Sequence, residues 1–149
     1  MNRRGLLLGS CLLLSASAAL AQAPAVDPLA SLDGTDRSAF RTIIRAQMDA
    51  FLADDAERAF SYASPGIQTR FGNATNFLAS VAASYGPVYR PQAVLFQEVI
   101  AIAGQPAQRV LVQAPDGGTV LAVYPMERQS DGSWRIDGCL LLRSDAQML

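Results

Sequence analysis

The sequence predicts one α+β domain in which about three N-terminal helices pack in a curved, four-stranded antiparallel meander. Two patterns lead to this prediction. Apolar residues recur at helical spacing in the first half of the chain, whereas short β-rich runs and turn residues alternate after Pro91. The 149 residues, half of them apolar, suffice for one domain with a core and are too few for two.

Residues 1–21 have the pattern of a secretory signal peptide, with paired arginines before an apolar run that ends in small residues. Ala19 and Ala21 form an A-x-A pair, so we expect cleavage between Ala21 and Gln22. The paired arginines leave the general secretory and the twin-arginine routes both open. We expect a periplasmic or secreted product with no membrane attachment, because no later apolar stretch is long enough to span a bilayer.

The composition excludes several kinds of chemistry. Loss of the signal leaves ten arginines (12 minus two) against 13 acidic residues, a charge of about −3 that disfavours nucleic acid and anionic membranes as partners. The chain has no histidine, so histidine-based nucleophile systems and the usual zinc sites cannot form. We expect no metal and no cofactor. Cys139, the one cysteine after the signal, is expected to be a small buried residue, with an intermolecular disulfide as the alternative.

The helices follow a flexible lead-in over 22–35. The strongest helical period begins after Asp36, the expected cap, and runs to Leu52. A second helix is expected from Asp54, which has capping-box spacing to Glu57. Next come a turn at Ser64-Pro65-Gly66, one further turn over 67–71, and a third helix that Asn73 caps and Gly86-Pro87 ends.

Four β-rich runs, joined by short turns, predict the meander. They cover residues 94–102, 109–114, 119–124 and 134–142. Pro125 indicates a bulge or a free edge at the end of the third run. The domain is therefore expected over 36–143, with a C-terminal tail over 144–149. Several runs are apolar on both faces, which suggests a homodimer through the sheet.

A family resemblance covers nearly the whole expected domain. The segments that carry it are AQMDAFLADDAERAFSYASPGIQTRFGNATNFLASVAASYGPVYRP and MERQSDGSWRIDGC. They resemble the domain of unknown function family 4864. The resemblance implies a small, often exported bacterial protein without an established activity or catalytic residues to transfer. The order of elements is also similar to the cystatin-like and nuclear-transport-factor-2-like cone folds, which host both enzymes and binding pockets and therefore do not decide the chemistry.

Four residues are candidate ligand contacts at the mouth of such a cone: Arg70, Tyr89, Arg90 and Tyr124. Each arginine could bind a carboxylate or phosphate. A structural role is also open: Arg70 could hold a helix-terminal carbonyl, which we favour, and Arg90 could pair with an acid. Ser64 is interpreted as a turn residue, because a serine nucleophile needs a base that this chain lacks. Asp54 and Asp55 are explained by a helix start rather than by catalysis.

A carboxylate and a tyrosine could together form a cofactor-free isomerase or cyclase site, as Asp137 or Glu98 with Tyr124 or Tyr89. Strand alternation argues against Asp137, because Trp134 and Ile136 are expected to face the helices and Asp137 would then face solvent as a pair with Arg135. The sequence therefore favours a binding or accessory module for a small apolar or anionic ligand. The enzyme and a dimerising interaction domain stay open as alternatives.

Overall fold

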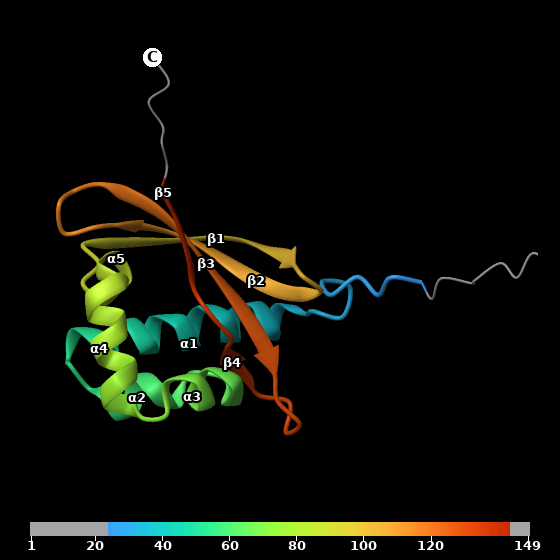
Figure 1. Cartoon of the computed structure of the whole chain (residues 1–149). Helices are drawn as coiled ribbons and strands as arrows, with labels where there is room; N and C mark the ends of the chain where they lie inside the picture. Colours follow the sequence, from blue (N-terminus) through green and yellow to red (C-terminus); the bar gives the residue numbers. More distant parts are fainter. Residues whose placement is uncertain (1–23, 144–149) are drawn as a thin grey trace, which may run out of the picture.

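The computed structural model describes residues 24–143. The expected signal peptide, the cleavage site between Ala21 and Gln22, and the tail over 144–149 lie outside the described residues. The predicted α+β class is confirmed: within residues 24–143, five helices precede a five-stranded antiparallel sheet. The helices lie on one side of the curved sheet (Figure 1). None of the helices in the described range is long and apolar enough to cross a membrane.

The first helix, α1 (Gly34–Leu52), begins three residues earlier than the sequence suggested. Asp33 is its N-cap and Asp36 is its third residue. The two aspartates form a capping box, in which Asp36 N donates to Asp33 Oδ1 at 2.8 Å. The apolar stripe of α1 is buried as its period predicts, with Phe40, Ile44 and Met48 at the centre of the main core.

Three further helices start at short polar caps. The cap of α2 (Ala56–Ser61) is Asp55 and not Asp54, since the Asp55 side chain accepts from Arg58 N at 3.1 Å. Ser64 caps α3 (Pro65–Phe71), and Asn73 caps α4 (Ala74–Ser84) as expected. The predicted stop at Gly86-Pro87 ends α4 and also begins a short helix, α5 (Gly86–Tyr89).

The sheet contains β1 (Ala93–Ile102), β2 (Gln105–Gln113), β3 (Thr119–Arg128), β4 (Trp134–Ile136) and β5 (Leu140–Arg143). Its order is β1-β2-β3-β4, all antiparallel, and β5 also pairs with β3. The expected single fourth strand over 134–142 is therefore wrong: it is divided at 137–139 into β4, which pairs with Met126–Arg128, and β5, which pairs with Val120–Val123.

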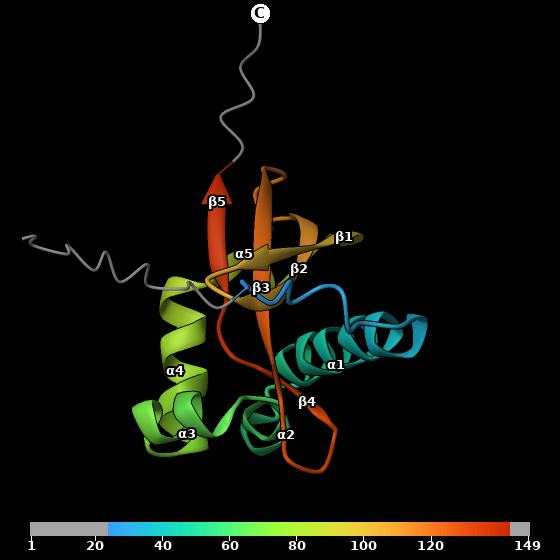
Figure 2. The same ribbon diagram turned by 90° about the vertical axis from the view of Figure 1, so that its right-hand side faces the viewer.

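The two faces of the sheet have different surroundings. Val110, Ala122 and Tyr124 point to the helices and are buried in the main core. The opposite face carries a row of directly paired leucines, one from each of four strands: Leu95, Leu111, Leu121 and Leu142. No helix covers this outer face in either view of the described chain (Figures 1 and 2). Leu95 and Leu142 are accordingly 61% and 52% exposed.

Candidate functional site

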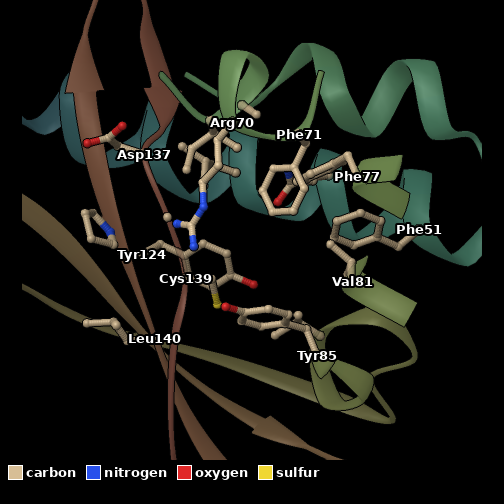
Figure 3. Close-up of a pocket in the computed structure, with 17 residues that line it drawn as sticks. Phe51, Arg70, Phe71, Phe77, Val81, Tyr85, Tyr124, Asp137, Cys139 and Leu140 are labelled. Carbon is tan, nitrogen blue, oxygen red and sulfur yellow. The ribbon is translucent and has the colours of Figure 1, made fainter. Parts of the chain in front are cut away.

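A largely apolar cavity of about 330 Å³ lies between the helices and the divided edge of the sheet. Its volume falls at the lower end of the range of small-molecule sites, about 300–1,000 Å³. The sheet side of its wall comes from Tyr124 and Pro125 of β3 and from the segment 136–140. The helical side comes from α1, α3, α4 and α5 (Figure 3). The helical lining residues are Gln47, Phe51, Ile67, Arg70, Phe71, Phe77, Val81, Tyr85 and Val88.

The cavity exists because the last strand is interrupted. Pro125 has no N–H to donate to the neighbouring chain, although β3 shows no bulge or free edge there and continues to Arg128. The chain leaves the sheet after Ile136, and Asp137 N still donates to Pro125 O at 2.8 Å. Gly138 then has φ 152°, a value that favours glycine. Pairing resumes at Leu140, which leaves an opening beside Tyr124 and Pro125.

Aromatic rings form much of the helical wall. Phe77 of α4 lies between two rings that also line the cavity, with its centroid 6.0 Å from Phe51 and 5.4 Å from Phe71. The Phe71 and Phe77 planes are at 74°, an edge-to-face arrangement that aromatic pairs prefer. The rings belong to a second buried cluster, separate from the core under the sheet. This part of the wall is therefore packed and preformed.

Asp137 fixes the segment between β4 and β5. Its Oδ1 accepts from Ser64 Oγ at 2.6 Å, and its Oδ2 accepts from Gln105 Nε2 at 2.9 Å. The prediction that Asp137 pairs with Arg135 in solvent is wrong, because the strand ends at Ile136 and its alternation does not extend to Asp137. Arg135 instead donates to Ser61 O at 2.6 Å. Asp137 lines the cavity, but its carboxylate points away from Arg70 (Figure 3).

Arg70 supplies the positive charge of the cavity. It lies in the last turn of α3, and its guanidinium points to the side where Tyr124 and Cys139 are labelled (Figure 3). Its Cζ lies 5.8 Å from the centroid of Phe71, a cation–π contact that holds it over a lining ring. The favoured structural role, binding a helix-terminal carbonyl, is not what the structure shows: among the described residues Arg70 makes no hydrogen bond and no ion pair. The guanidinium is thus available to an anion.

Tyr124 and Cys139 meet at the inner wall. The Tyr124 side chain is 1% exposed, and its hydroxyl has no hydrogen-bond partner within the described chain. Burial, together with the neighbouring Cys139 thiol, raises the pKa of Tyr124 well above its usual value. Burial raises the pKa of Cys139 to about 12. Cys139 as a whole residue is only partly buried, yet its sulfur is enclosed, so both groups are neutral at physiological pH.

The two other candidate contacts, Tyr89 and Arg90, do not line the cavity. They belong to a separate cluster with Asp54, whose Oδ1 accepts from Arg90 Nη2 at 2.7 Å and from the Tyr89 hydroxyl. Arg90 also donates to Phe51 O at the end of α1. Hydrogen bonds from Tyr89 and Arg90 lower the pKa of Asp54. Of the two roles left open for Arg90, the structure therefore shows pairing with an acid.

The carboxylate–tyrosine combinations are only partly brought together. Asp137 and Tyr124 line the same cavity, but Asp137 already accepts two hydrogen bonds and the Tyr124 hydroxyl is covered. Glu98 pairs with Arg109 on the outer side of the sheet, away from both. No group of three potential metal ligands occurs in the described part of the chain. Among the predicted pairs, therefore, none places a free carboxylate oxygen beside an accessible tyrosine hydroxyl.

Several lining residues could not be identified from the sequence. In the sequence, Phe71 and Phe77 occupy apolar helix positions, and nothing distinguishes them from core residues. Gln47 lies on the apolar stripe of α1 and is 4% exposed, with its Nε2 donating to Ala59 O at 3.1 Å. A polar residue in an apolar stripe was the one available signal. Cys139 was expected to be a small buried residue of a strand, and its position in the cavity wall was not predicted.

Comparison with known proteins gives the family. The family model described as "Domain of unknown function (DUF4864)" matches residues 33–149. No curated protein and no solved structure matches the chain. The likeness to cystatin-like and nuclear-transport-factor-2-like folds therefore stays a prediction. The match begins at the Asp33 cap of α1 and includes every helix and strand described above. The chain thus belongs to the DUF4864 family of domains of unknown function.

Proposed function

We propose that this protein is an exported binding module that holds a small, mainly apolar ligand in the cavity beside the divided sheet edge. The observation that carries the proposal is Arg70, an arginine with no partner among the described residues at an apolar cavity of about 330 Å³. The walls are preformed by packed rings, so little ordering free energy opposes binding. An enzyme is the weaker alternative, because both oxygens of Asp137 are already hydrogen-bonded.

The proposal is tested by native mass spectrometry of the protein starting at Gln22, purified from the periplasm of expressing cells. We expect a non-covalent adduct of small mass. Leu140→Trp should remove it, because Leu140 lines the cavity where β5 begins, and its 49% exposure lets the fold accept a larger side chain at that edge. Leu142→Trp is the matched control, since Leu142 is 52% exposed two residues further along and does not line the cavity.

Added ligand gives the second readout. Cinnamate, a small aromatic acid, should bind by calorimetry with a Kd of roughly 10 μM to 1 mM, the range set by a ligand of this size. Leu140→Trp should weaken binding at least about tenfold, and Leu142→Trp should leave it unchanged. The proposal would be rejected by two results together. The unmodified protein and both variants would show no adduct in native mass spectrometry, and Leu140→Trp would not weaken any binding of cinnamate.

The outer face of the sheet favours a second, compatible function: pairing with a second copy of this chain. A contiguous row of four leucines whose two end members are more than half exposed is unusual on a monomer. Glu98 and Arg109, an ion pair on this side, offer a twofold-related copy one charge of each sign. A stable interface buries about 800 Å² per partner, so the residues around the row would have to join it.

A further inference from the structure

The cavity restricts the charge of its occupant. Among the residues that line it, Arg70 is the one cation and Asp137 the one acid. A single guanidinium can neutralise one negative charge, and it fits the planar, two-oxygen shape of a carboxylate. A dianion such as a phosphate monoester would keep a second charge beside apolar walls and near the Asp137 carboxylate. The charges therefore favour a monoanion.

The walls restrict the body of the occupant. Five aromatic side chains line the cavity: Phe51, Phe71, Phe77, Tyr85 and Tyr124. The rings around Phe77 meet edge-on or tilted, at interplanar angles of 38° and 74°, so they present both edges and faces to the space between them. A flat ring can add to such a set with the same edge-to-face geometry, whereas a flexible alkyl chain loses rotamer freedom when it is enclosed.

The position of Arg70 relates the charge of the occupant to its aromatic body. The Arg70 Cζ lies 5.8 Å from the Phe71 centroid, so the exposed charge is held beside an aromatic wall of the cavity. An acid whose ring packs between the phenylalanines would then have its carboxylate at the opening. One side of the carboxylate would contact Arg70, and its other side would stay hydrated. We infer that the ligand of this cavity is a monocarboxylate with a flat aromatic body; this rests on the function proposed above.

The inference is tested with three probes that have the same number of non-hydrogen atoms. Cinnamate has the ring and the charge, cinnamamide has the ring without the charge, and nonanoate has the charge without the ring. We expect cinnamate to bind about five- to twentyfold more tightly than cinnamamide, a modest factor because Arg70 is exposed and its ion pair is screened. Nonanoate should bind more weakly than cinnamate by about fivefold.

Two arginine variants separate recognition from folding. Arg70→Gln should raise the Kd of cinnamate to that of cinnamamide and leave the Kd of cinnamamide unchanged, while Arg70→Lys should retain part of the preference because the charge remains. Arg90→Gln is the matched control, since Arg90 is paired with Asp54 and does not line the cavity. It should keep the full preference for cinnamate. Circular dichroism of each variant verifies that it is folded.

The outcomes separate this inference from the proposed function. If cinnamamide binds as tightly as cinnamate, or if Arg70→Gln leaves the preference intact, the anionic part is overturned. If nonanoate binds as tightly as cinnamate, the aromatic part is overturned. In both cases binding that Leu140→Trp abolishes would still support the cavity as a binding site. If none of the three probes binds, the inference fails; the proposed function fails as well only if native mass spectrometry also shows no adduct.

Discussion

Ser64 and Asp137 are 73 residues apart in the chain and are joined by a 2.6 Å hydrogen bond from Ser64 Oγ to Asp137 Oδ1. Ser64 is fully buried, and its Oγ also accepts from Ile67 N at 3.2 Å as the cap of α3. The backbones of the same two segments are also hydrogen-bonded, since Ser64 N donates to Ile136 O at 2.8 Å. One small side chain thus fixes both the start of α3 and the segment that opens the sheet.

Ser64→Ala is expected to destabilise the protein by about 2–3 kcal/mol, because it removes a helix cap and leaves one oxygen of Asp137 without its donor. Urea unfolding measures the change. Ser130→Ala, in an exposed turn, is the control and should cost less than about 0.5 kcal/mol. Equal stability of the two variants would show that the bond contributes nothing to the fold.

Local chemistry explains what the sequence could predict. The period of α1, the cap at Asn73 and the turns between strands depend on residues within a few positions of one another, so they were recognisable without tertiary knowledge. The cap positions Asp33 and Asp55 were missed because neighbouring aspartates, Asp36 and Asp54, offered equally good spacing. Backbone conformation decides such cases: Asp54 has φ 51°, which leaves the cap to Asp55.

The cavity could not be predicted for a different reason. The run from Trp134 to Leu142 has the composition of one strand, and its division depends on Pro125 in another strand and on the Ser64–Asp137 bond. Of the four predicted ligand contacts, Arg70 and Tyr124 line the cavity. Tyr89 and Arg90 were placed at its mouth because they follow the last helix, whereas Asp54 holds them elsewhere.

Arg90→Gln is expected to lower stability by about 1 kcal/mol without changing cinnamate binding. The Arg90–Asp54 ion pair lies at the surface and is worth little by itself. The larger loss comes from the hydrogen bond to Phe51 O, which satisfies a carbonyl at the end of α1. Arg41→Gln, on the exposed face of α1, is the control for loss of a positive charge. The explanation fails if the two variants unfold at the same urea concentration.

Tyr124→Phe is expected to be neutral or to stabilise the protein by up to about 1 kcal/mol. The reason is that its buried hydroxyl has no hydrogen-bond partner within the described chain and its removal breaks no bond. Thermal and urea unfolding measure the change. Tyr89→Phe is the contrasting control, because that hydroxyl donates to Asp54. A loss of more than about 1 kcal/mol in Tyr124→Phe would indicate that the hydroxyl is bonded after all.

Stability is expected to fall as the pH rises from about 9 toward 12. The pKa of Cys139 is about 12 in the fold against 9.0 ordinarily, and that of Tyr124 is raised well above 10.0. Above their ordinary pKa values the unfolded chain releases these protons while the folded chain keeps them, so the unfolded state is stabilised relative to the folded state. Urea unfolding across this range should show a smaller decline in Cys139→Ala. An unchanged decline in that variant would assign the effect to other groups.

The same pKa predicts an unreactive thiol. Raising the pKa from 9.0 to about 12 lowers the thiolate fraction at pH 8 about a thousandfold, and the thiolate is the reactive form. Ellman's reagent should therefore modify Cys139 in the folded protein far more slowly than in urea, and cinnamate should slow the reaction further because Cys139 lines the cavity. Equally fast reaction in the folded and unfolded protein would show that the sulfur is exposed, and an intermolecular disulfide would then be the better interpretation.

The leucine row gives the last prediction. If the outer face pairs with a second copy, sedimentation should show a concentration-dependent dimer, and Leu95→Glu should dissociate it by placing an unpaired charge in an apolar interface. The monomer should stay folded, since Leu95 is 61% exposed and its side chain contributes little to the core. Leu52→Glu is the matched control, because Leu52 is 49% exposed but lies on α1. A monomer at all concentrations, or a dimer that Leu52→Glu and Leu95→Glu affect equally, would exclude pairing through this face.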